Sequence, residues 1–181
     1  MSERPTEPAF IALGSNIEPE YHLPEATRHL HSLGRMQAVS LAYQSKPIGD
    51  RKQSDFLNAA VLLSVSEDPE LLRALLREIE ASLGRVRTED KYASRTIDLD
   101  LVLLGDRVDP KLHLPDPDIL TREHMAIPLA ELDANFCHPT THEALGTIAN
   151  RLRSDSLRAN QDVSRQLSLI LSEGEQADSP R

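Results

Sequence analysis

The chain has 181 residues, a length typical of one domain, and 39% of them are hydrophobic, which is enough for a core. A net charge of −9 argues against general affinity for nucleic acid or an anionic membrane, because both need a basic surface. The single cysteine, Cys137, excludes an intramolecular disulfide and a thiolate metal site; we expect a small buried residue and a reducing, cytoplasmic location, since no apolar run resembles a signal peptide or a membrane span.

The first half of the chain mixes predicted strands and helices. A loose N-terminus over 1–8 precedes a buried strand over 9–14, a helix from Pro24 to Leu33 with apolar residues at helical spacing, and a strand over 36–45. A loop with Pro, Gly and charges follows over 46–54, then a strand over 55–66 and a helix over 67–84, which Gly84 ends.

The segment IDLDLVLL, 97–104, is the most strand-like of the chain, yet it contains Asp98 and Asp100. The period of two predicts that the two aspartates share one face with Val102 and Leu104, and that Ile97, Leu99, Leu101 and Leu103 share the other.

The second half is less regular. We predict irregular structure over 112–120, one or two short helices over 121–132 broken at Pro128, a helix over 142–152, a peripheral helix over 154–172 and a disordered tail over 173–181. Strands and helices without steady alternation favour the α+β class, in one domain over 9–153.

The aspartate pair suggests a metal site. Two carboxylates on one strand face are costly unless something neutralises them, and Mg²⁺ binds through one or two carboxylates while substrate phosphates and water complete its shell. The alternative is an exposed edge strand with two solvated aspartates, and the short D-x-D pattern does not decide between them.

Four basic residues precede this strand: Arg85, Arg87, Lys91 and Arg95. Arginine forks match phosphate oxygens, so a carboxylate pair next to them is a minimal apparatus for phosphoryl transfer. A solvated charged turn is the competing interpretation, because Glu89 and Asp90 partly balance the charge. The sequence has neither a P-loop motif nor a protein-kinase motif.

At G-R-x-R…R-T-I-D-L-D-L-V-L-L-G the sequence resembles the 6-hydroxymethyl-7,8-dihydropterin pyrophosphokinase family. Further stretches agree in order and spacing, and the resemblance covers roughly residues 9–150: IALGSN (11–16), YQSKPIG (43–49), DFLNAAV (55–61) and LP…R…PLAEL (114–132).

The resemblance implies a ferredoxin-like antiparallel sheet flanked by helices in a three-layer α-β-α sandwich. It implies an ATP-dependent diphosphotransferase that moves the β,γ-pyrophosphoryl group of ATP to the hydroxymethyl group of 6-hydroxymethyl-7,8-dihydropterin and releases AMP, in folate biosynthesis. Two Mg²⁺ ions, small-molecule substrates only, and a monomer or weak dimer are expected. Three loops, roughly 14–22, 46–54 and 84–95, would close over the substrates and exclude water.

Carried over position by position, the resemblance also assigns roles. Asp98 and Asp100 match the metal ligands; Asp98 would also approach the pterin, and Asp100 would accept the hydroxyl proton. Arg85, Arg95 and Arg122 match phosphate-facing arginines, and Arg85 and Arg95 join the aspartates in the catalytic set. The nucleotide side would further include Glu80, Arg87, Tyr92 and Asp116, and the pterin pocket Asn16, Ser45, Pro47, Ile48, Phe56, Asn58 and His124.

Lys46 stands where the family often has Pro, and Tyr92 where it often has Trp. Two further departures alter a phosphate contact and the stacking on the pterin. Asp116 stands where the family usually has a histidine that donates to ATP phosphates, which an ionised aspartate cannot do. His124 stands where an aromatic residue usually stacks on the pterin. A pyrophosphokinase for a different alcohol, and a pterin- or nucleotide-binding module without catalysis, are therefore kept as alternatives. Phe56 and Asn58, at i and i+2 of a strand, could also be a core residue and its polar neighbour.

Overall fold

The computed structural model describes residues 5–49, 52–90 and 93–177. Its strands are β1 (Glu7–Ser15), β2 (Arg35–Val39), β3 (Ala42–Ser45), β4 (Phe56–Val65), β5 (Asp98–Leu104) and β6 (Arg158–Asn160). Its helices are α1 (Pro19–Leu30), α2 (Pro69–Ser82), α3 (Glu123–Leu132), α4 (Leu145–Leu152) and α5 (Gln161–Ala177), with short 3₁₀ turns η1 (His31–Leu33), η2 (Pro110–Leu112) and η3 (Pro117–Leu120).

All strand pairs of the sheet are antiparallel, in the order β5-β1-β4-β3-β6, and β2 pairs with β4 next to β3. The first half of the sheet runs from β1 through α1 to β2 and β3, and the second half runs from β4 through α2 to β5. In the sheet, β1 lies between β4 and β5, the two strands of the second half. This is the expected ferredoxin-like connection, and it places β5, with its two aspartates, next to β1 at an edge of the sheet.

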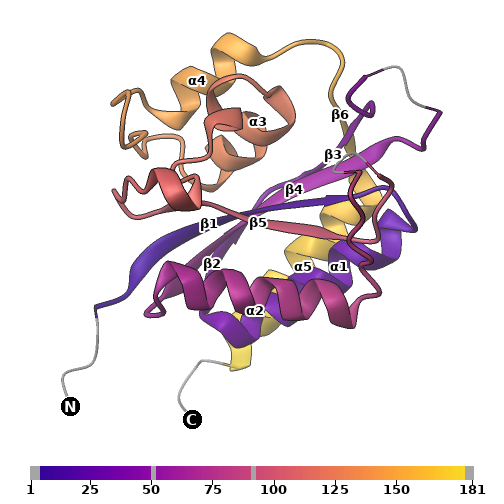
Figure 1. Ribbon diagram of the computed structural model, residues 1–181, viewed down its shortest axis with the longest axis horizontal. Coiled ribbons are helices and arrows are strands. Elements are labelled where there is room, and N and C mark those ends of the chain that lie inside the picture. Colours follow the sequence, from indigo (N-terminus) through magenta and orange to yellow (C-terminus); the bar gives the residue numbers. More distant parts are fainter. Residues whose placement is uncertain (1–4, 50–51, 91–92, 178–181) are drawn as a thin grey trace.

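The sheet is covered on both faces, as Figure 1 shows: α1, α2 and α5 lie on one side, and α3 and α4 on the other. Each side has an apolar core of its own. Leu23, Leu72 and Leu167 are buried with the inner residues of β1, β4 and β5 in the first core, and Phe10, Ile127 and Ile148 are buried in the second. The three-layer α-β-α sandwich is therefore confirmed.

The predicted alternation along β5 holds only in its first part. Ile11 pairs with Leu101, but the preceding residue Phe10 pairs with Leu103, so β5 has an extra residue at Val102. After this bulge the faces change: Val102 and Leu103 both belong to the core under α3, and Leu104 belongs to the opposite core. Two predictions were therefore wrong: that Leu103 faces the same way as Leu101, and that Leu104 shares a face with the two aspartates. The bulge is the reason for both.

The predicted strand over 36–45 is interrupted at Ser40 and Leu41. Val39 pairs with Val61, whereas Tyr43 already pairs with Asn58, so the two strands do not share one register on β4. The Ser40 hydroxyl accepts a hydrogen bond from the amide of Ala60 at 2.8 Å, which satisfies the ladder at the interruption.

Two helices tolerate an internal proline. α1 begins at Pro19, earlier than predicted, and continues through Pro24; α3 continues through Pro128, where a break was predicted. Ala126, Ile127 and Leu129 are all buried in α3. We attribute the continuous helix to this burial, which outweighs the hydrogen bond lost at the proline.

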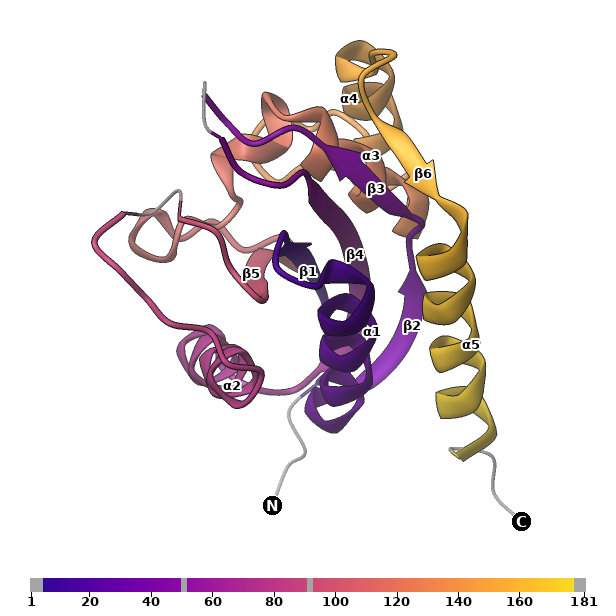
Figure 2. The ribbon, with the colours of Figure 1, turned by 90° about the vertical axis from the view of Figure 1, so that its right-hand side faces the viewer.

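The C-terminal segment is part of the sheet and of the core. β6 pairs with β3, and α5 lies along β2 and α1, as Figure 2 shows. α5 extends to Ala177, into the segment expected to be disordered, and β1 begins at Glu7, inside the segment expected to be loose. Glu7 pairs with Arg107 through two hydrogen bonds of 2.9 and 2.8 Å.

Cys137 is exposed, which corrects the expectation of a buried residue: it lies on a surface loop, paired with Ala144 in an isolated bridge. Among the described residues there is no helix both long and apolar enough to cross a membrane.

Candidate active site

A pocket of about 230 Å³ opens over the β5, β1 and β4 strands, on the side of α3. It brings together eight residues that the sequence predicted for the site: Ser45, Ile48, Phe56, Asn58, Arg95, Asp98, Asp100 and His124. Four further polar or flexible side chains also line it. Lys46 and Gln53 belong to the loop over 46–54 that was expected to close over the substrates, whereas the sequence had assigned no role to Asp118 and Met125.

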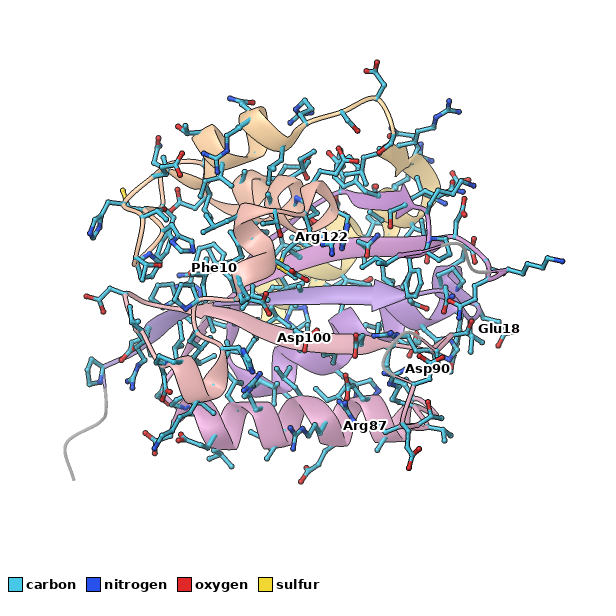
Figure 3. The ribbon with its side chains drawn as sticks, turned by 45° about the horizontal axis from the view of Figure 1, so that its top comes forward. Phe10, Glu18, Arg87, Asp90, Asp100 and Arg122 are labelled. Carbon is cyan, nitrogen blue, oxygen red and sulfur yellow. The ribbon has the colours of Figure 1, made fainter. Side chains whose placement is uncertain are left out.

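The two aspartates face this pocket because they lie at alternate positions of β5. Their partners across the ladder on β1 are Gly14 for Asp98 and Ala12 for Asp100, and these small residues leave space above the strand. Figure 3 shows Asp100 on β5, with Arg122 on the side of α3 and Arg87 on the side of α2. A rigid strand therefore holds both carboxylates at one opening.

Asp98 is already paired with two arginines. Arg95 forms a short ion pair with one carboxylate oxygen of Asp98, and an Nη atom of Arg85 lies 3.6 Å from the other. Both arginine side chains are largely buried: that of Arg95 is 13% exposed and that of Arg85 is 10% exposed. The Arg95 guanidinium also lies over the Phe56 ring, 5.6 Å from its centroid, which joins the basic loop to the opposite wall of the pocket.

Asp100 has a different environment. No hydrogen bond or ion pair to its carboxylate is seen within the part of the chain that the structure describes. Burial, and then the negative charges of Asp98, Asp116 and Glu80, raise the pKa of Asp100 to about 7. Many protein atoms surround this carboxylate, but the residue is exposed toward the pocket that it lines, so water there screens part of the effect. Because these negative charges repel one another, a cation bound next to Asp100 would be favoured.

The aspartate pair suits Mg²⁺. Among the described residues no cluster of three or more His, Cys, Asp or Glu could hold a metal ion alone. Two carboxylates on a strand, in a pocket with room for phosphate oxygens and water, match the incomplete protein shell that Mg²⁺ usually has. A bound cation would contact Asp98, which also pairs with Arg85 and Arg95, and would coordinate the carboxylate of Asp100.

The opposite wall comes from β4 and β3. The Asn58 amide group donates hydrogen bonds to the Ser45 hydroxyl at 2.8 Å and to the Tyr43 carbonyl at 3.3 Å. Its oxygen accepts none from the described residues and lies 3.6 Å from where a side chain on Gly14 would begin. Asn58 therefore offers an acceptor to a ligand, and Gly14 keeps the approach to it open.

Asn16 and Pro47 do not line the pocket. Asn16 is buried, and its side chain forms hydrogen bonds with the backbone of Ser54 and of Arg95. Tyr92, expected on the nucleotide side, lies outside the described residues.

The remaining nucleotide-side residues surround the pocket without lining it. Glu80 on α2 is buried, accepts a hydrogen bond from the amide of Leu99 and forms an ion pair with Arg87. Burial raises the pKa of Glu80, while the Leu99 hydrogen bond and Arg87 act in the opposite direction. Arg122 is exposed and lies 3.9 Å from Asp118.

The two residues that depart from the family pattern behave differently. The carboxylate of Asp116 accepts a hydrogen bond from the amide of Asp118 at 2.8 Å and caps η3, so Asp118 and not Asp116 reaches the pocket. His124, on the first turn of α3, lines the pocket. Burial, followed by the charge of Arg122, lowers the pKa of His124, which favours a neutral ring at pH near 7.

Residues 10–134 match the family model of 7,8-dihydro-6-hydroxymethylpterin-pyrophosphokinase (HPPK). The chain is 38% identical over 129 residues to the 2-amino-4-hydroxy-6-hydroxymethyldihydropteridine pyrophosphokinase of Bacillus subtilis, with 68% of this chain and 77% of the relative covered. It is 33% identical over 138 residues to the enzyme of the same name from Haemophilus influenzae, with 74% and 86% covered.

Solved structures are similar in fold. The crystal structure of wild-type Plasmodium falciparum HPPK-DHPS with STZ-DHP superposes with a TM-score of 0.67 at 12% sequence identity. The match covers 88% of this chain and 47% of that chain, so this chain spans about half the length of that protein. At this identity the likeness concerns the fold alone.

Proposed function

The chain belongs to the 7,8-dihydro-6-hydroxymethylpterin-pyrophosphokinase family, and on this premise we propose which of its residues carry out the reaction. The protein is an ATP-dependent diphosphotransferase of folate biosynthesis, which transfers the pyrophosphoryl group to the hydroxymethyl group of the dihydropterin. The observation that supports our assignment is that Asp98, Asp100 and Arg95 meet Asn58 and His124 around one pocket.

In the proposed step, the hydroxymethyl oxygen of the pterin attacks the β-phosphorus of ATP. The bond from that phosphorus to the oxygen bridging the α- and β-phosphates breaks, and AMP leaves with the electron pair. The hydroxyl proton passes to the carboxylate of Asp100, which lines the same pocket. Arg95 and Arg85 neutralise charge on the transferred phosphates, and Arg122 binds the phosphates from the side of α3.

Asp98 and Asp100 would hold the magnesium, for which we propose two ions. When bound, Mg²⁺ supplies charge neutralisation and fixes the phosphate oxygens next to the acceptor. The contribution of the protein is the rigid spacing of two carboxylates on β5 and the supply of arginines at the same opening.

For the pterin we propose the wall formed by β3 and β4. The Asn58 oxygen can accept a hydrogen bond from a ring N–H group, and the Ser45 hydroxyl is fixed next to it by the Asn58 amide. Phe56 and His124 both line the pocket and offer flat faces to a flat ring. Ile48 adds apolar contact, and Pro47 and Asn16, which do not line the pocket, belong to the loops after β3 and β1.

On the nucleotide side we propose Glu80, Arg87 and Tyr92, with Asp116 acting through the cap of η3. A cytoplasmic location and a monomer or weak dimer stay predictions.

The test of this function is the identity of the released nucleotide. Purified protein with Mg²⁺, ATP and 6-hydroxymethyl-7,8-dihydropterin should release AMP and not ADP. AMP release only with another alcohol would overturn the pterin assignment, and nucleotide binding without turnover on any acceptor would make the chain a binding module.

The metal assignment has a separate test. Asp98→Asn and Asp100→Asn should each lower kcat by at least about 10²-fold, since each removes a ligand of the ion that neutralises the phosphates. Near-normal turnover of either variant at saturating Mg²⁺ would remove that residue from the metal site.

A further inference from the structure

Asn16 is the first residue after β1, and its side chain is almost completely used by the protein itself. It is only 4% exposed. Its oxygen accepts a hydrogen bond from the backbone amide of Arg95 at 2.8 Å. Its amide group donates to the carbonyl of Ser54 at 3.3 Å and to the hydroxyl of Ser94 at 3.2 Å. Little capacity is left for a bond to a ligand.

The backbone of Arg95 is held on both sides by this turn. While the Asn16 side chain accepts from its amide, the backbone amides of Asn16 and Ile17 donate to the Arg95 carbonyl at 3.1 and 3.2 Å. The contact resembles one rung of a sheet ladder, made between residues that are far apart in the sequence. Such a rung fixes the direction in which the Arg95 side chain leaves the backbone.

This direction matters because the Arg95 side chain connects two parts of the site. It forms the short ion pair with Asp98 and lies over the Phe56 ring. Its Nε also donates to the carbonyl of Ala93 at 3.2 Å, within the same loop. A shift of the Arg95 backbone would therefore disturb both its contact with the metal-binding aspartate and the wall for the pterin.

The contacts of Asn16 join three loops. Asn16 belongs to the loop after β1, Ser54 to the loop before β4, and Ser94 and Arg95 to the loop before β5. Figure 3 shows Glu18 and Asp90, from the first and the third of these loops, at the same end of the molecule.

We infer that Asn16 is a positioning residue, which holds Arg95 in its reactive orientation and links the three loops around the pocket, instead of binding the pterin itself. This inference rests on the proposed function, because Arg95 is assigned there to the transferred phosphates. It predicts that substitution of Asn16 lowers turnover only when the Arg95 side chain is present.

A double-mutant cycle measures this dependence. Asn16→Ala should lower kcat by about 10- to 100-fold, the size expected for a misplaced group, and leave the KM for the pterin within about threefold. In the Arg95→Ala background, Asn16→Ala should lower kcat by less than about threefold more, since the group that it positions is already absent. Asn150→Ala, an exposed asparagine on α4, is the matched control and should keep wild-type rates.

Two outcomes would overturn the inference. A loss of more than about tenfold in pterin affinity with kcat unchanged would make Asn16 a pterin ligand. Losses that multiply in full in the double variant would mean that Asn16 acts independently of Arg95. If Asn16→Ala does not fold, the cycle is run with Asn16→Asp, which keeps the acceptor for the Arg95 amide and loses both donors. We then expect a smaller loss in kcat than for Asn16→Ala, and no loss in the Arg95→Ala background.

A readout without substrates separates this inference from the proposed function. In Asn16→Ala the backbone amide of Arg95 should exchange its hydrogen at least about tenfold faster than in the wild type, because its acceptor is removed. Unchanged exchange would contradict the inference even if AMP release is confirmed. Faster exchange would support it even if the wild-type protein released no AMP with the pterin.

Discussion

The buried carboxylate of Glu80 accepts a hydrogen bond of 2.8 Å from the backbone amide of Leu99, the residue between the two aspartates. Within the residues that the structure describes, β5 is an edge strand, so this amide has no strand partner there on its outer side. The second oxygen of Glu80 binds Arg87. α2 thus fixes the strand at the point from which Asp98 and Asp100 project.

Removing this carboxylate should loosen the strand. We expect Glu80→Ala to lower the free energy of unfolding by about 1–3 kcal/mol, because the Leu99 amide loses its acceptor inside the protein. The Mg²⁺ concentration needed for half-maximal activity should rise as well, because the spacing of the aspartates is less fixed. Denaturant unfolding and Mg²⁺ titrations of activity measure the two effects.

Two variants control for other causes. Glu80→Gln keeps an oxygen acceptor and should lose clearly less stability than Glu80→Ala. Glu78→Ala changes an exposed glutamate of the same helix and should stay within about 0.5 kcal/mol of the wild type. If Glu80→Gln and Glu80→Ala were equally unstable, the Leu99 hydrogen bond would not be the important contact.

A pH dependence follows from Asp100. Its pKa is raised to about 7 in the folded protein, whereas an unfolded aspartate titrates near about 3.9. The folded state therefore holds this proton more tightly, and the stability it contributes is present below about pH 4 and lost as the pH rises through about 7. In metal-free protein at about pH 8, Asp100→Asn should stabilise the fold by roughly 1 kcal/mol, less than the full shift, because solvent screens the exposed carboxylate.

With Mg²⁺ bound, the wild type should be more stable than Asp100→Asn, the reverse of the order in metal-free protein. At about pH 8 the ion should stabilise the wild type but not Asp100→Asn, and at about pH 6 its effect on the wild type should be weaker, because a proton competes for the carboxylate. Unfolding curves with and without Mg²⁺ at both values test this. Equal stabilisation by Mg²⁺ at the two pH values would contradict the shifted pKa as the cause.

The pattern of apolar residues was sufficient for most strands and helices, but not for the faces of β5. Asp98 and Asp100 mark one face clearly, because a polar residue alternates with an apolar one. From Leu101 to Leu104 every residue is apolar, because both faces of the sheet are covered at this point. No alternation of polar and apolar residues is present there, so the sequence gives no sign of the bulge. The change of face at Leu103 became visible only in the register with Phe10.

The site shows the same limit. Motif spacing predicted that Asp98, Asp100 and Arg95 lie close together, since they are neighbours in the chain. It did not predict the contact of Arg95 with Phe56 or of Asn16 with Ser54 and Arg95, which depends on loops meeting in space. In the segment around Asp116 and Asp118 either carboxylate could have reached the pocket, and local capping of η3 decides for Asp118.

His124 should determine how tightly the pterin stacks. We expect His124→Phe to increase pterin affinity by about 2- to 10-fold, the range of an added aromatic contact, and His124→Ala to decrease it. Titration of the pterin in the presence of a non-hydrolysable ATP analogue measures both. His29→Phe, an exposed histidine of α1, is the control and should leave affinity unchanged. Unchanged affinity in both His124 variants would mean that this ring does not face the pterin.

The last prediction concerns α5, which lies beyond the family match. Leu167 is completely buried between α5 and the sheet, whereas Leu169 on the same helix is 57% exposed. Leu167→Ala should therefore lower the free energy of unfolding by about 2–5 kcal/mol, because it opens a cavity in the core, and Leu169→Ala should change it by less than about 0.5 kcal/mol. Both variants should keep the wild-type kcat below their unfolding transitions, since α5 contributes no residue to the pocket. A fall in kcat for folded Leu167→Ala would show that this helix acts on the site by way of β3. This strand carries Ser45, and its Ala42 amide donates a hydrogen bond to the Ser164 hydroxyl of α5 at 2.9 Å.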